Sequence, residues 1–329
     1  MNVGIVGAGR QGWRRARALE SFPEDRLVAV ADVDASAAER LAAAYGAAAS
    51  PDWRALLDVG DLDAVIVCTP PDSHPAITVA AMDRGRHVLV EKPLARSVDE
   101  AEPIAAAAER ALARGVICAV GFNYRHHPAI RQARRWVDEG AIGELMYARM
   151  RHGIGGRQDY AADWRATAQT SGGGELLDQG VHLLDLARWF FGDFSEVKAM
   201  LATAYWPIAP LEDNAFVLLR TARGQVVQLH VSWTEWRNLF SLELFGRDGY
   251  VRVDGLGGSY GSETAVLGKR DFDAPFSERV IEYRGEDRSW RDEWAEFREA
   301  ARQRTRPVTG AADGLAALQL AATTYASAR

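Results

Sequence analysis

The chain has 329 residues, 48% of them hydrophobic and 26% charged, so it holds enough apolar side chains for a sizeable core and, we expect, two domains. Its formal net charge is −6, and basic and acidic residues are interspersed, which excludes the basic surface of a nucleic-acid-binding protein and favours a small-molecule partner. No apolar run is long enough to cross a bilayer, no signal peptide is recognisable, and both cysteines lie in apolar runs. We therefore expect a cytoplasmic protein without membrane contact or a disulfide.

The first third of the chain alternates short apolar runs with Ala-rich helical patterns. Strands are predicted at residues 3–6, 27–31, 64–68, 87–90 and 116–120. Ser73 and Ser97 are the predicted N-caps of two of the intervening helices, and Glu100 follows Ser97 at the spacing of a capping box. This alternation predicts an α/β domain over residues 1–122 with a doubly wound parallel sheet, the Rossmann arrangement.

Residues 123–329 have a different pattern, typical of an α+β domain. Helices are predicted at 128–139 and 180–191, and strands at 144–152, 197–206, 214–221, 225–234, 240–245 and 250–253. Short Gly-containing turns between the later strands predict consecutive antiparallel pairing and a large, mostly antiparallel open-faced sheet. Two final helices, 290–304 and 311–327, are candidates for packing back onto the first domain.

A glycine-rich loop opens the first helix of the chain. Its residues are Gly7, Ala8, Gly9, Arg10, Gln11 and Gly12. Glycines there permit a tight turn, close approach to a pyrophosphate and close helix packing, while the helix N-terminus supplies amide donors. Asp32 ends the second strand, where an acid binds the ribose 2′-hydroxyl and repels a 2′-phosphate. The pattern predicts NAD, with some NADP use left open by Arg10.

Two further motifs follow predicted strands at their carboxyl ends, where open α/β sheets bind ligands. One runs from Thr69 and Pro70 to His74 and is equally well explained as an ordinary strand-to-helix loop. The other is Glu91-Lys92-Pro93, in which the proline restricts Lys92 to extended geometry. A lysine shielded there from water becomes a proton donor or acceptor, whereas an exposed one is only a solvated charge.

The third motif lies in the second domain and ends in Asp178 and His182. Four residues apart on a helix, the two side chains share a face, so the acid can orient and charge the imidazole. The same spacing also suits a purely structural hydrogen-bonded pair. Two ligands do not complete a metal site, so we predict no metal.

Together these segments resemble the family of glucose-fructose oxidoreductase, inositol dehydrogenase and MocA-like proteins. The resemblance rests on the glycine loop, Thr69-Pro70 with His74, Glu91-Lys92-Pro93, Gly121-Phe122-Asn123-Tyr124-Arg125, Asp163-Trp164-Arg165, and Gly173-Gly174 through Asp178 and His182. It implies an NAD-dependent oxidoreductase in which hydride passes between nicotinamide and a carbon bearing a hydroxyl group on a sugar, cyclitol or similar polyol. It also implies a homodimer or homotetramer formed through the sheet of the second domain.

The resemblance also implies roles for individual residues. Lys92 would contact the reacting oxygen, and His182, assisted by Asp178, would share the acid-base role with it. Cofactor contacts are expected from the glycine loop and from Asp32, Thr69, Pro70, His74, Glu91, Lys92, Asn123, Trp164 and Arg165. Substrate contacts are expected from Lys92, Tyr124, Arg151, Tyr160, Asp178 and His182.

Several residues permit more than one interpretation of the substrate and the activity. Acids such as Glu175 and Glu212 suit an amino sugar or aminocyclitol, or are solvated loop acids and caps. Tyr160 is able to stack on a sugar ring or to pack in a core, and Arg151 is a candidate for the phosphate of a nucleotide sugar. The sequence is also compatible with a nucleotide-sugar dehydrogenase or reductase, with a non-catalytic NAD-sensing protein, and with an enzyme that uses a tightly held NAD for redox-neutral chemistry.

Overall fold

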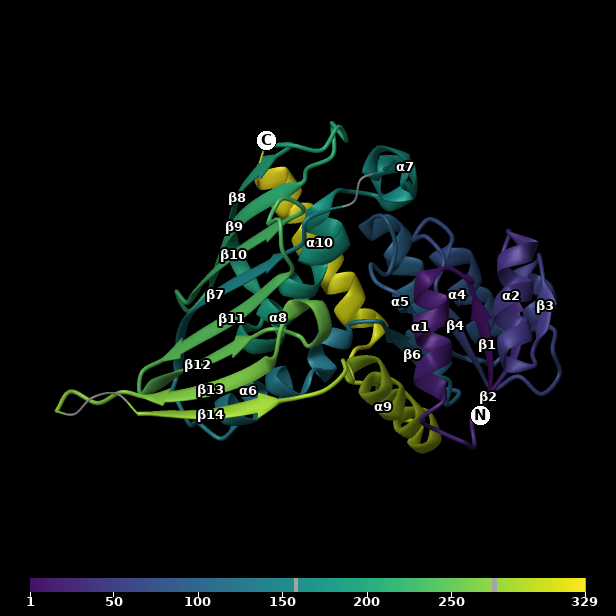
Figure 1. The fold of residues 1–329 in the computed structure, drawn as a ribbon, viewed down its shortest axis with the longest axis horizontal. Coiled ribbons are helices and arrows are strands. Elements are labelled where there is room, and N and C mark those ends of the chain that lie inside the picture. The colour runs from purple at the N-terminus through teal and green to yellow at the C-terminus, as the bar shows by residue number, and fades with distance from the viewer. Residues whose placement is uncertain (157–158, 274–276, 329) are drawn as a thin grey trace. The chain divides into compact units, whose positions relative to one another are not determined.

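The computed structural model describes residues 1–156, 159–273 and 277–328, and the chain divides into two compact units (Figure 1). The first unit comprises Met1–Phe122 and Trp290–Leu318, and the second comprises Asn123–Ser289 and Gln319–Arg329. The final part of the chain is therefore shared between the two units. No helix among the described residues is long and apolar enough to span a membrane.

The first unit contains a six-stranded parallel sheet of order β3-β2-β1-β4-β5-β6. Its strands are β1 (Asn2–Val6), β2 (Arg26–Ala31), β3 (Ala48–Ser50), β4 (Ala64–Val67), β5 (His87–Val90) and β6 (Cys118–Val120). Its helices are α1 (Arg10–Leu19), α2 (Ala35–Tyr45), α3 (Trp53–Leu57), α4 (His74–Asp83), α5 (Val98–Leu112), α9 (Ser289–Gln303) and the first part of α10 (Ala311–Ser327). The predicted doubly wound sheet is confirmed. The short strand β3 was not predicted, because its Ala-Ala-Ser sequence carries no apolar alternation.

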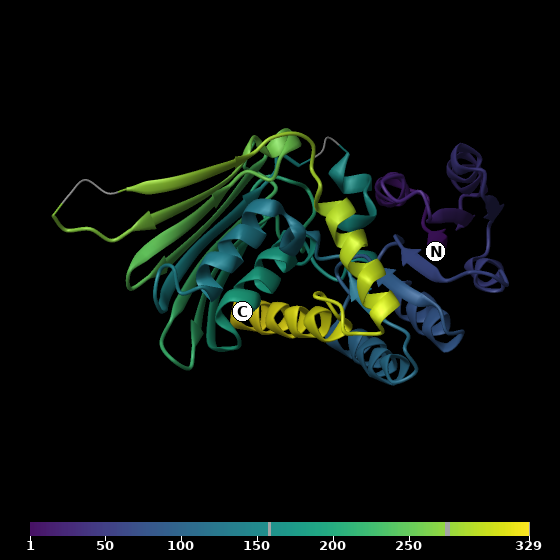
Figure 2. The same cartoon turned by 90° about the horizontal axis from the view of Figure 1, so that it is seen from below.

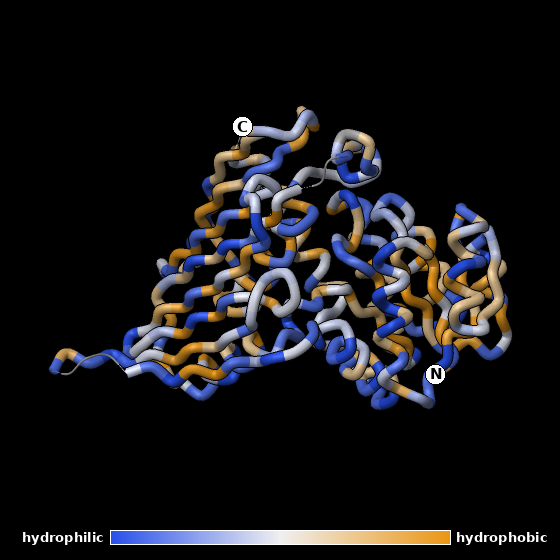
Figure 3. The backbone as a smooth tube through the Cα atoms, in the orientation of Figure 1, coloured by the Kyte–Doolittle hydropathy of each residue, from blue (hydrophilic) through white to orange (hydrophobic). Residues whose placement is uncertain are grey.

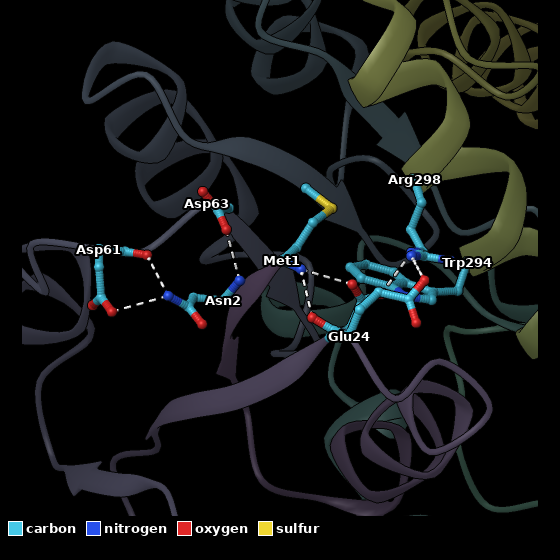
Figure 4. A network of polar contacts seen from close by, with 8 residues as sticks. Met1, Asn2, Glu24, Asp61, Asp63, Trp294 and Arg298 are labelled. Carbon is cyan, nitrogen blue, oxygen red and sulfur yellow. Dashed lines mark hydrogen bonds and ion pairs between the residues drawn. The ribbon is translucent and has the colours of Figure 1, made fainter.

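Helix α9 completes the core of this unit from the far end of the sequence. Trp294 and Phe297 are buried in the same cluster as residues of β1, α1 and α2. Figure 4 shows how Trp294 and Arg298 join the polar network at the amino ends of β1 and β2. The Trp294 indole donates to Asp25 at 2.8 Å, and the same carboxylate pairs with Arg298 at 2.7 Å and with the Met1 amine at 2.7 Å. Buried apolar area and this network hold α9 against the sheet.

Both predicted N-cap positions are confirmed, but only one serine caps with its side chain. The Ser97 hydroxyl accepts from the Glu100 amide at the start of α5. Ser73 is the N-cap residue of α4, and its side chain makes no capping hydrogen bond. Its hydroxyl lies instead 2.7 Å from Thr69 Oγ1 and 2.9 Å from the Pro70 carbonyl oxygen. The hydroxyl thus stabilises the loop between β4 and α4 rather than the helix.

The second unit contains an eight-stranded sheet of order β14-β13-β12-β11-β7-β10-β9-β8. Its strands are β7 (Leu145–Gly153), β8 (Phe194–Ala202), β9 (Asn214–Thr221), β10 (Val226–Ser232), β11 (Leu239–Gly246), β12 (Gly249–Asp254), β13 (Glu263–Lys269) and β14 (Glu278–Tyr283). The prediction of consecutive antiparallel pairing fails at one point. Strand β7 inserts between β10 and β11 and runs parallel to β10. The order of strands along the chain cannot disclose such an insertion, and β13 and β14 were also not predicted.

Helices cover one face of this sheet and leave the other face open. The covering segments include η1 (Asn123–His126), α6 (Pro128–Asp138), the π-helical turn η4 (Leu176–Gly180) and α8 (Val181–Phe191). In Figure 2 the teal helices α6 and α8 lie along one side of the strands. On β9 buried residues alternate with exposed ones, and the exposed residues include the apolar Phe216 and Leu218. The tube in Figure 3 shows apolar and polar residues interspersed along the strands of this sheet.

The remaining short helices lie in the connections of the second unit. They are η2 (Tyr160–Ala162), η3 (Trp164–Ala166), α7 (Ala168–Ser171) and η5 (Gly258–Tyr260). Turn η5 belongs to the Gly-rich connection between β12 and β13, in which Gly255, Gly257, Gly258 and Gly261 have positive φ. This connection carries Tyr260, which contributes to the cluster described below.

Candidate active site

The glycine-rich loop has the local geometry that a dinucleotide requires. Gly7 has a φ of +100°, and a Cβ there would lie 2.7 Å from the Cys68 carbonyl carbon. A Cβ on Gly12 would lie 2.1 Å from the Gly7 oxygen. Around Gly9, by contrast, a Cβ would meet nothing within 4 Å, so this loop leaves open space above the first turn of α1. Two glycines thus fix the loop and the third leaves room for a phosphate at the helix N-terminus.

Asp32 is tied directly to this loop. One carboxylate oxygen accepts from the Ala8 amide at 2.6 Å, and the other accepts from the Asp34 amide at 2.9 Å. The side chain is only partly buried. These bonds orient the carboxylate at the carboxyl end of β2, beside the loop, where the ribose of a dinucleotide is read in Rossmann domains.

The other two motifs of the first unit meet at the same edge of the sheet. The fully buried His74 bridges them, because its ring nitrogens lie 2.9 Å from the Thr69 carbonyl oxygen and 3.0 Å from that of Pro93. Whichever nitrogen carries the proton, an N–H of His74 donates to one of these carbonyls. Burial lowers the pKa of His74, although the two carbonyls and Glu91 oppose the shift. His74 therefore holds the main chain beside Lys92.

Glu91 is held from its other side by a buried ion-pair cluster that the sequence did not disclose. Arg15, in α1, donates to Glu91 at 2.7 Å and also to Glu293, in α9. All three side chains are at most 6% exposed. Arg15 also lies over the Trp290 ring, 4.5 Å from its centroid. Burial, with the nearby Glu91 carboxylate, raises the pKa of Glu293 to about 7 despite the opposing charge of Arg15.

In the second unit, Asp178 and His182 lie on two different kinds of helix. Asp178 belongs to the π-helical turn η4, and His182 is the second residue of α8. The shared face expected from their spacing assumed one continuous α-helix. Asp178 pairs with Arg165 at 3.3 Å, and the Arg165 guanidinium lies 4.2 Å from the centroid of the Trp164 ring. Trp164, Arg165 and Asp178, all predicted site residues, thus lie together.

His182 is stacked on Tyr124. Their ring centroids are 4.0 Å apart with an interplanar angle of 7°, and both side chains are largely buried. Burial raises the pKa of Tyr124 well above its ordinary value, and the nearby Tyr260, Glu175, Asp287 and Asp178 act in the same direction. The Tyr124 phenol therefore remains protonated and is available as a hydrogen-bond donor in an acidic setting.

Two members of this cluster, His152 and Tyr260, were not predicted as site residues, and a third, Glu175, was named only as an acid for an amino sugar or as a loop acid or cap. His152 is buried near the end of β7, with Nδ1 3.8 Å from the buried Glu175 carboxylate and Nε2 3.0 Å from the Tyr260 hydroxyl. Its ring centroid is 5.8 Å from that of Tyr124. The one available sequence signal was His152, which occupies a core-facing position on β7, a strand in which buried and exposed residues alternate. The Gly-rich connection that carries Tyr260 gives no chemical signal by itself.

The segment that bears Asp178 is anchored by the last helix of the chain. Glu212 accepts from the Leu176 amide at 3.0 Å and from the Tyr325 hydroxyl at 2.8 Å, and its carbonyl accepts from the Glu175 amide at 2.9 Å. Burial raises the pKa of Glu212. This acid therefore caps the start of η4, which is the structural role left open for it by the sequence.

The remaining predicted residues occupy distinct environments. Asn123 is buried, and its amide donates to Ser289 at 2.8 Å. Tyr160 is fully buried, with its ring centroid 4.3 Å from that of Trp233. Arg151 is exposed on β7, where it points away from the face that carries its neighbour His152. Tyr160 and Arg151 therefore lie outside the cluster around Tyr124. The described residues contain no group of three or more His, Cys, Asp or Glu that would bind a metal ion.

Known proteins resemble both parts of the chain. Residues 1–122 match the family described as "Oxidoreductase family, NAD-binding Rossmann fold", and residues 130–252 match the GFO/IDH/MocA C-terminal domain. Levoglucosan dehydrogenase from Pseudarthrobacter phenanthrenivorans is 33% identical over 239 residues, which cover 68% of this chain and 59% of that enzyme. The aligned region thus spans about three fifths of that relative.

Two further similarities extend over more of the relative's length. dTDP-3,4-didehydro-2,6-dideoxy-alpha-D-glucose 3-reductase from Streptomyces antibioticus is 34% identical over 257 residues, 77% of this chain and 75% of that protein. The crystal structure of an oxidoreductase domain protein from Kribbella flavida has a TM-score of 0.89 and 28% identity, covering 100% of this chain and 97% of that one. The whole two-unit fold is therefore shared with known oxidoreductases.

Proposed function

Since the chain belongs to the Gfo/Idh/MocA family of oxidoreductases and its first unit is an NAD-binding Rossmann domain, we propose that it is an NAD-dependent oxidoreductase acting on a secondary alcohol or ketone of a sugar, cyclitol or amino sugar. The observation that carries this proposal is the position of Lys92. It lies at the same sheet edge as the glycine loop, one strand from the point between β1 and β4 where the strand order reverses. That point is where open α/β sheets bind their ligands.

The fit of NAD to the first unit rests on the glycine loop and Asp32. Gly9 and the amides at the start of α1 would accommodate the pyrophosphate, and Asp32 would accept hydrogen bonds from the ribose. When bound, NAD⁺ supplies the hydride acceptor. Asp32 disfavours a 2′-phosphate because two negative charges would face each other. NAD is therefore the proposed cofactor over NADP.

The protein supplies the proton chemistry. In the oxidative direction the acid-base group, Lys92 or His182, takes up the single substrate hydroxyl proton, and in reduction it returns that proton. Tyr124 keeps the His182 ring in place by stacking. Asp178, which pairs with Arg165, lies four residues before His182 in the sequence and supplies a negative charge. Tyr124 is a further candidate for a hydrogen bond to the substrate.

The experiment follows NADH absorbance with purified protein, NAD⁺ and, in turn, levoglucosan, myo-inositol and glucosamine. We expect NADH formation with at least one of them, and loss of turnover in Lys92→Ala with NADH binding retained. Lys269→Ala is the matched control, because Lys269 is exposed at the end of strand β13 of the other unit. Unchanged turnover in Lys92→Ala would refute the assignment of Lys92, and absence of NADH binding would refute the proposal as a whole.

A nucleotide sugar is the second candidate substrate, favoured by the similarity to the dTDP-sugar 3-reductase. The same assay in the reductive direction, with NADH and a dTDP-ketosugar, distinguishes the two. Consumption of NADH only with the nucleotide-linked sugar would select this candidate. NADH binding without any turnover would select the sensing protein, and product formation without net NADH change would select redox-neutral chemistry.

We further propose that two copies associate through the open face of the second unit's sheet. This face exposes Met200, Phe216 and Leu218, whose side chains are 76%, 48% and 50% exposed. Neighbouring apolar side chains of this size on one sheet face commonly mark a protein interface. Light scattering of the wild type and of Leu218→Asp tests the proposal. A monomeric wild type would refute it.

A further inference from the structure

Burying the Arg15–Glu91–Glu293 cluster costs free energy of folding, because apolar side chains alone would make a stable core at this position. Removing three ionisable side chains from water costs free energy that an apolar cluster of similar volume would avoid. Here the cluster draws one residue from α1, one from the end of β5 and one from α9, nearly 280 positions from the first. Within this cluster, Glu91 is the residue that immediately precedes Lys92 in the sequence.

The main chain around Lys92 is fixed from both sides by these buried groups. The Glu91 amide donates to the Val67 carbonyl at 2.9 Å, and the Glu91 side chain is held by Arg15. On the other side, the Pro93 carbonyl lies 3.0 Å from the His74 ring. Gly121 leaves no spare room, since a Cβ there would lie 2.7 Å from Arg15 and 3.0 Å from Glu91. The geometry leaves little play in the segment that presents the Lys92 amine.

We propose that Arg15 and Glu293 are positioning residues for Lys92: they fix Glu91, and through the Glu91–Lys92 main chain they fix the place and the electrostatic surroundings of the Lys92 amine. The proposal rests on the proposed acid-base role of Lys92. It assigns helix α9 a part in the chemistry of the first unit besides its part in the core.

The charge balance of the cluster makes this coupling measurable. Arg15 lies between the two carboxylates, and burial raises the pKa of Glu293 to about 7. The charged and titratable groups that face Glu293 are Arg15, Glu91 and Glu296. Cys68 lies within electrostatic reach of Arg15 and Glu91, and burial raises the pKa of its thiol so that it stays neutral.

The composition of the chain provides an unusual probe. It contains only three lysines, Lys92, Lys198 and Lys269, the other basic residues being arginines and histidines. Lys198 and Lys269 are exposed on the second unit, on β8 and β13. Lysine labelled with ¹³C at Cε therefore gives three side-chain NMR signals, of which two are internal controls. Substitution of each lysine by arginine assigns them.

The experiment records these signals from pH 5.5 to 11 in the full chain without cofactor or substrate. In the wild type we expect the Lys92 signal to show a small inflection near neutral pH in addition to its own titration, and Glu293→Gln to abolish that inflection. Arg15→Lys keeps the charge but loses the planar pair of guanidinium donors, so the Lys92 midpoint should move by about half a pH unit. This variant has a fourth lysine signal, which the double variant Arg15→Lys/Lys92→Arg assigns. The Lys198 and Lys269 signals should not change in either variant.

Arg298→Lys is the matched control, and its added lysine signal is assigned in the same way. It perturbs another buried-carboxylate pair of the same helix, the pair with Asp25 at the amino ends of the strands. We expect it to lower the melting temperature and leave the Lys92 signal as in the wild type. Lys92 titrations that superimpose in the wild type, Arg15→Lys and Glu293→Gln would overturn the proposal and leave the cluster a structural brace.

Should Arg15→Lys fail to fold, the wild-type inflection decides: its presence supports the proposal and its absence overturns it. Because no substrate is in the sample, this result is independent of the NADH assay. Failure of every polyol and sugar to be oxidised would refute the proposed function, while the coupling of Glu293 to Lys92 would still be measured. Where turnover is found, Arg15→Lys should lower kcat about tenfold with the KM for NAD⁺ nearly unchanged.

Discussion

Replacing Glu293 by glutamine should remove a specific pH dependence of stability. Burial raises the pKa of Glu293 from 4.5 to about 7, so the folded protein binds more protons here than the unfolded chain at intermediate pH. Its stabilising contribution is therefore complete below pH 4.5 and is lost as the pH rises through 7. The shift corresponds to about 3 kcal/mol between these limits. Glutamine keeps the neutral shape of the side chain without the titration.

The measurement is the free energy of unfolding in urea for the wild type and Glu293→Gln between pH 5 and 8.5. Groups common to both proteins cancel in the difference, so the stability of the variant relative to the wild type should rise with pH by at most about 3 kcal/mol. Glu299→Gln is the control, because Glu299 lies in the same helix but pairs with Arg302 at the surface. A difference that does not change with pH would refute the reasoning, since it would mean that Glu293 titrates alike in the folded and unfolded chains.

Three further substitutions test other parts of the structure. Asp32→Ala should raise the use of NADP⁺ relative to NAD⁺ by about tenfold or more in kcat/KM, because a carboxylate facing the 2′-phosphate is removed; a wild type that prefers NADP⁺ would contradict this. Gly12→Ala should destabilise the fold by about 1–3 kcal/mol and weaken NADH binding, since its Cβ would lie 2.1 Å from the Gly7 oxygen. Calorimetry measures the stability and fluorescence titration measures the NADH affinity. An unchanged NADH affinity would count against the loop geometry. Tyr325→Phe should cost about 1–2 kcal/mol in urea unfolding, because the Glu212 carboxylate loses a donor in a buried site, and wild-type stability would show that other donors replace it.

Local sequence patterns specified much of the first unit because they act over short distances. The glycine loop follows β1 directly, and the steric limits at Gly7 and Gly12 come from the loop itself and from the end of the neighbouring strand β4. Asp32 was recognisable because the carboxyl ends of all strands in a parallel sheet lie at the same edge, so the residue after the second strand lies near the glycine loop. Strand β3 escaped prediction because short exposed alanine runs carry no periodic signal.

The second unit shows where pattern reasoning stops. Apolar β-like runs bounded by turn residues identified β9 and β11 almost to the residue. Strand pairing depends on long-range contacts, so the insertion of β7 beside β10 was not visible. The π-helical turn at Leu176–Gly180 likewise reflects its tertiary surroundings, in which Glu212 caps the segment. The Asp178–His182 spacing was interpreted with the geometry of one continuous α-helix, which the π-helical turn does not have, and the acid-base role of the two residues stays a prediction.

The sequence by itself determined the parallel sheet, the glycine loop with Asp32 and the presence of Lys92, Asp178 and His182, because each is encoded within a few consecutive residues. Only the tertiary structure revealed that Arg15 joins Glu91 to Glu293 and that Tyr124 stacks on His182. These contacts join residues distant in the chain, and their energy comes from burial and from charge pairing in a low dielectric. A local sequence pattern reports neither the burial of a side chain nor its charge pairing, since both depend on the residues that surround it in the folded chain.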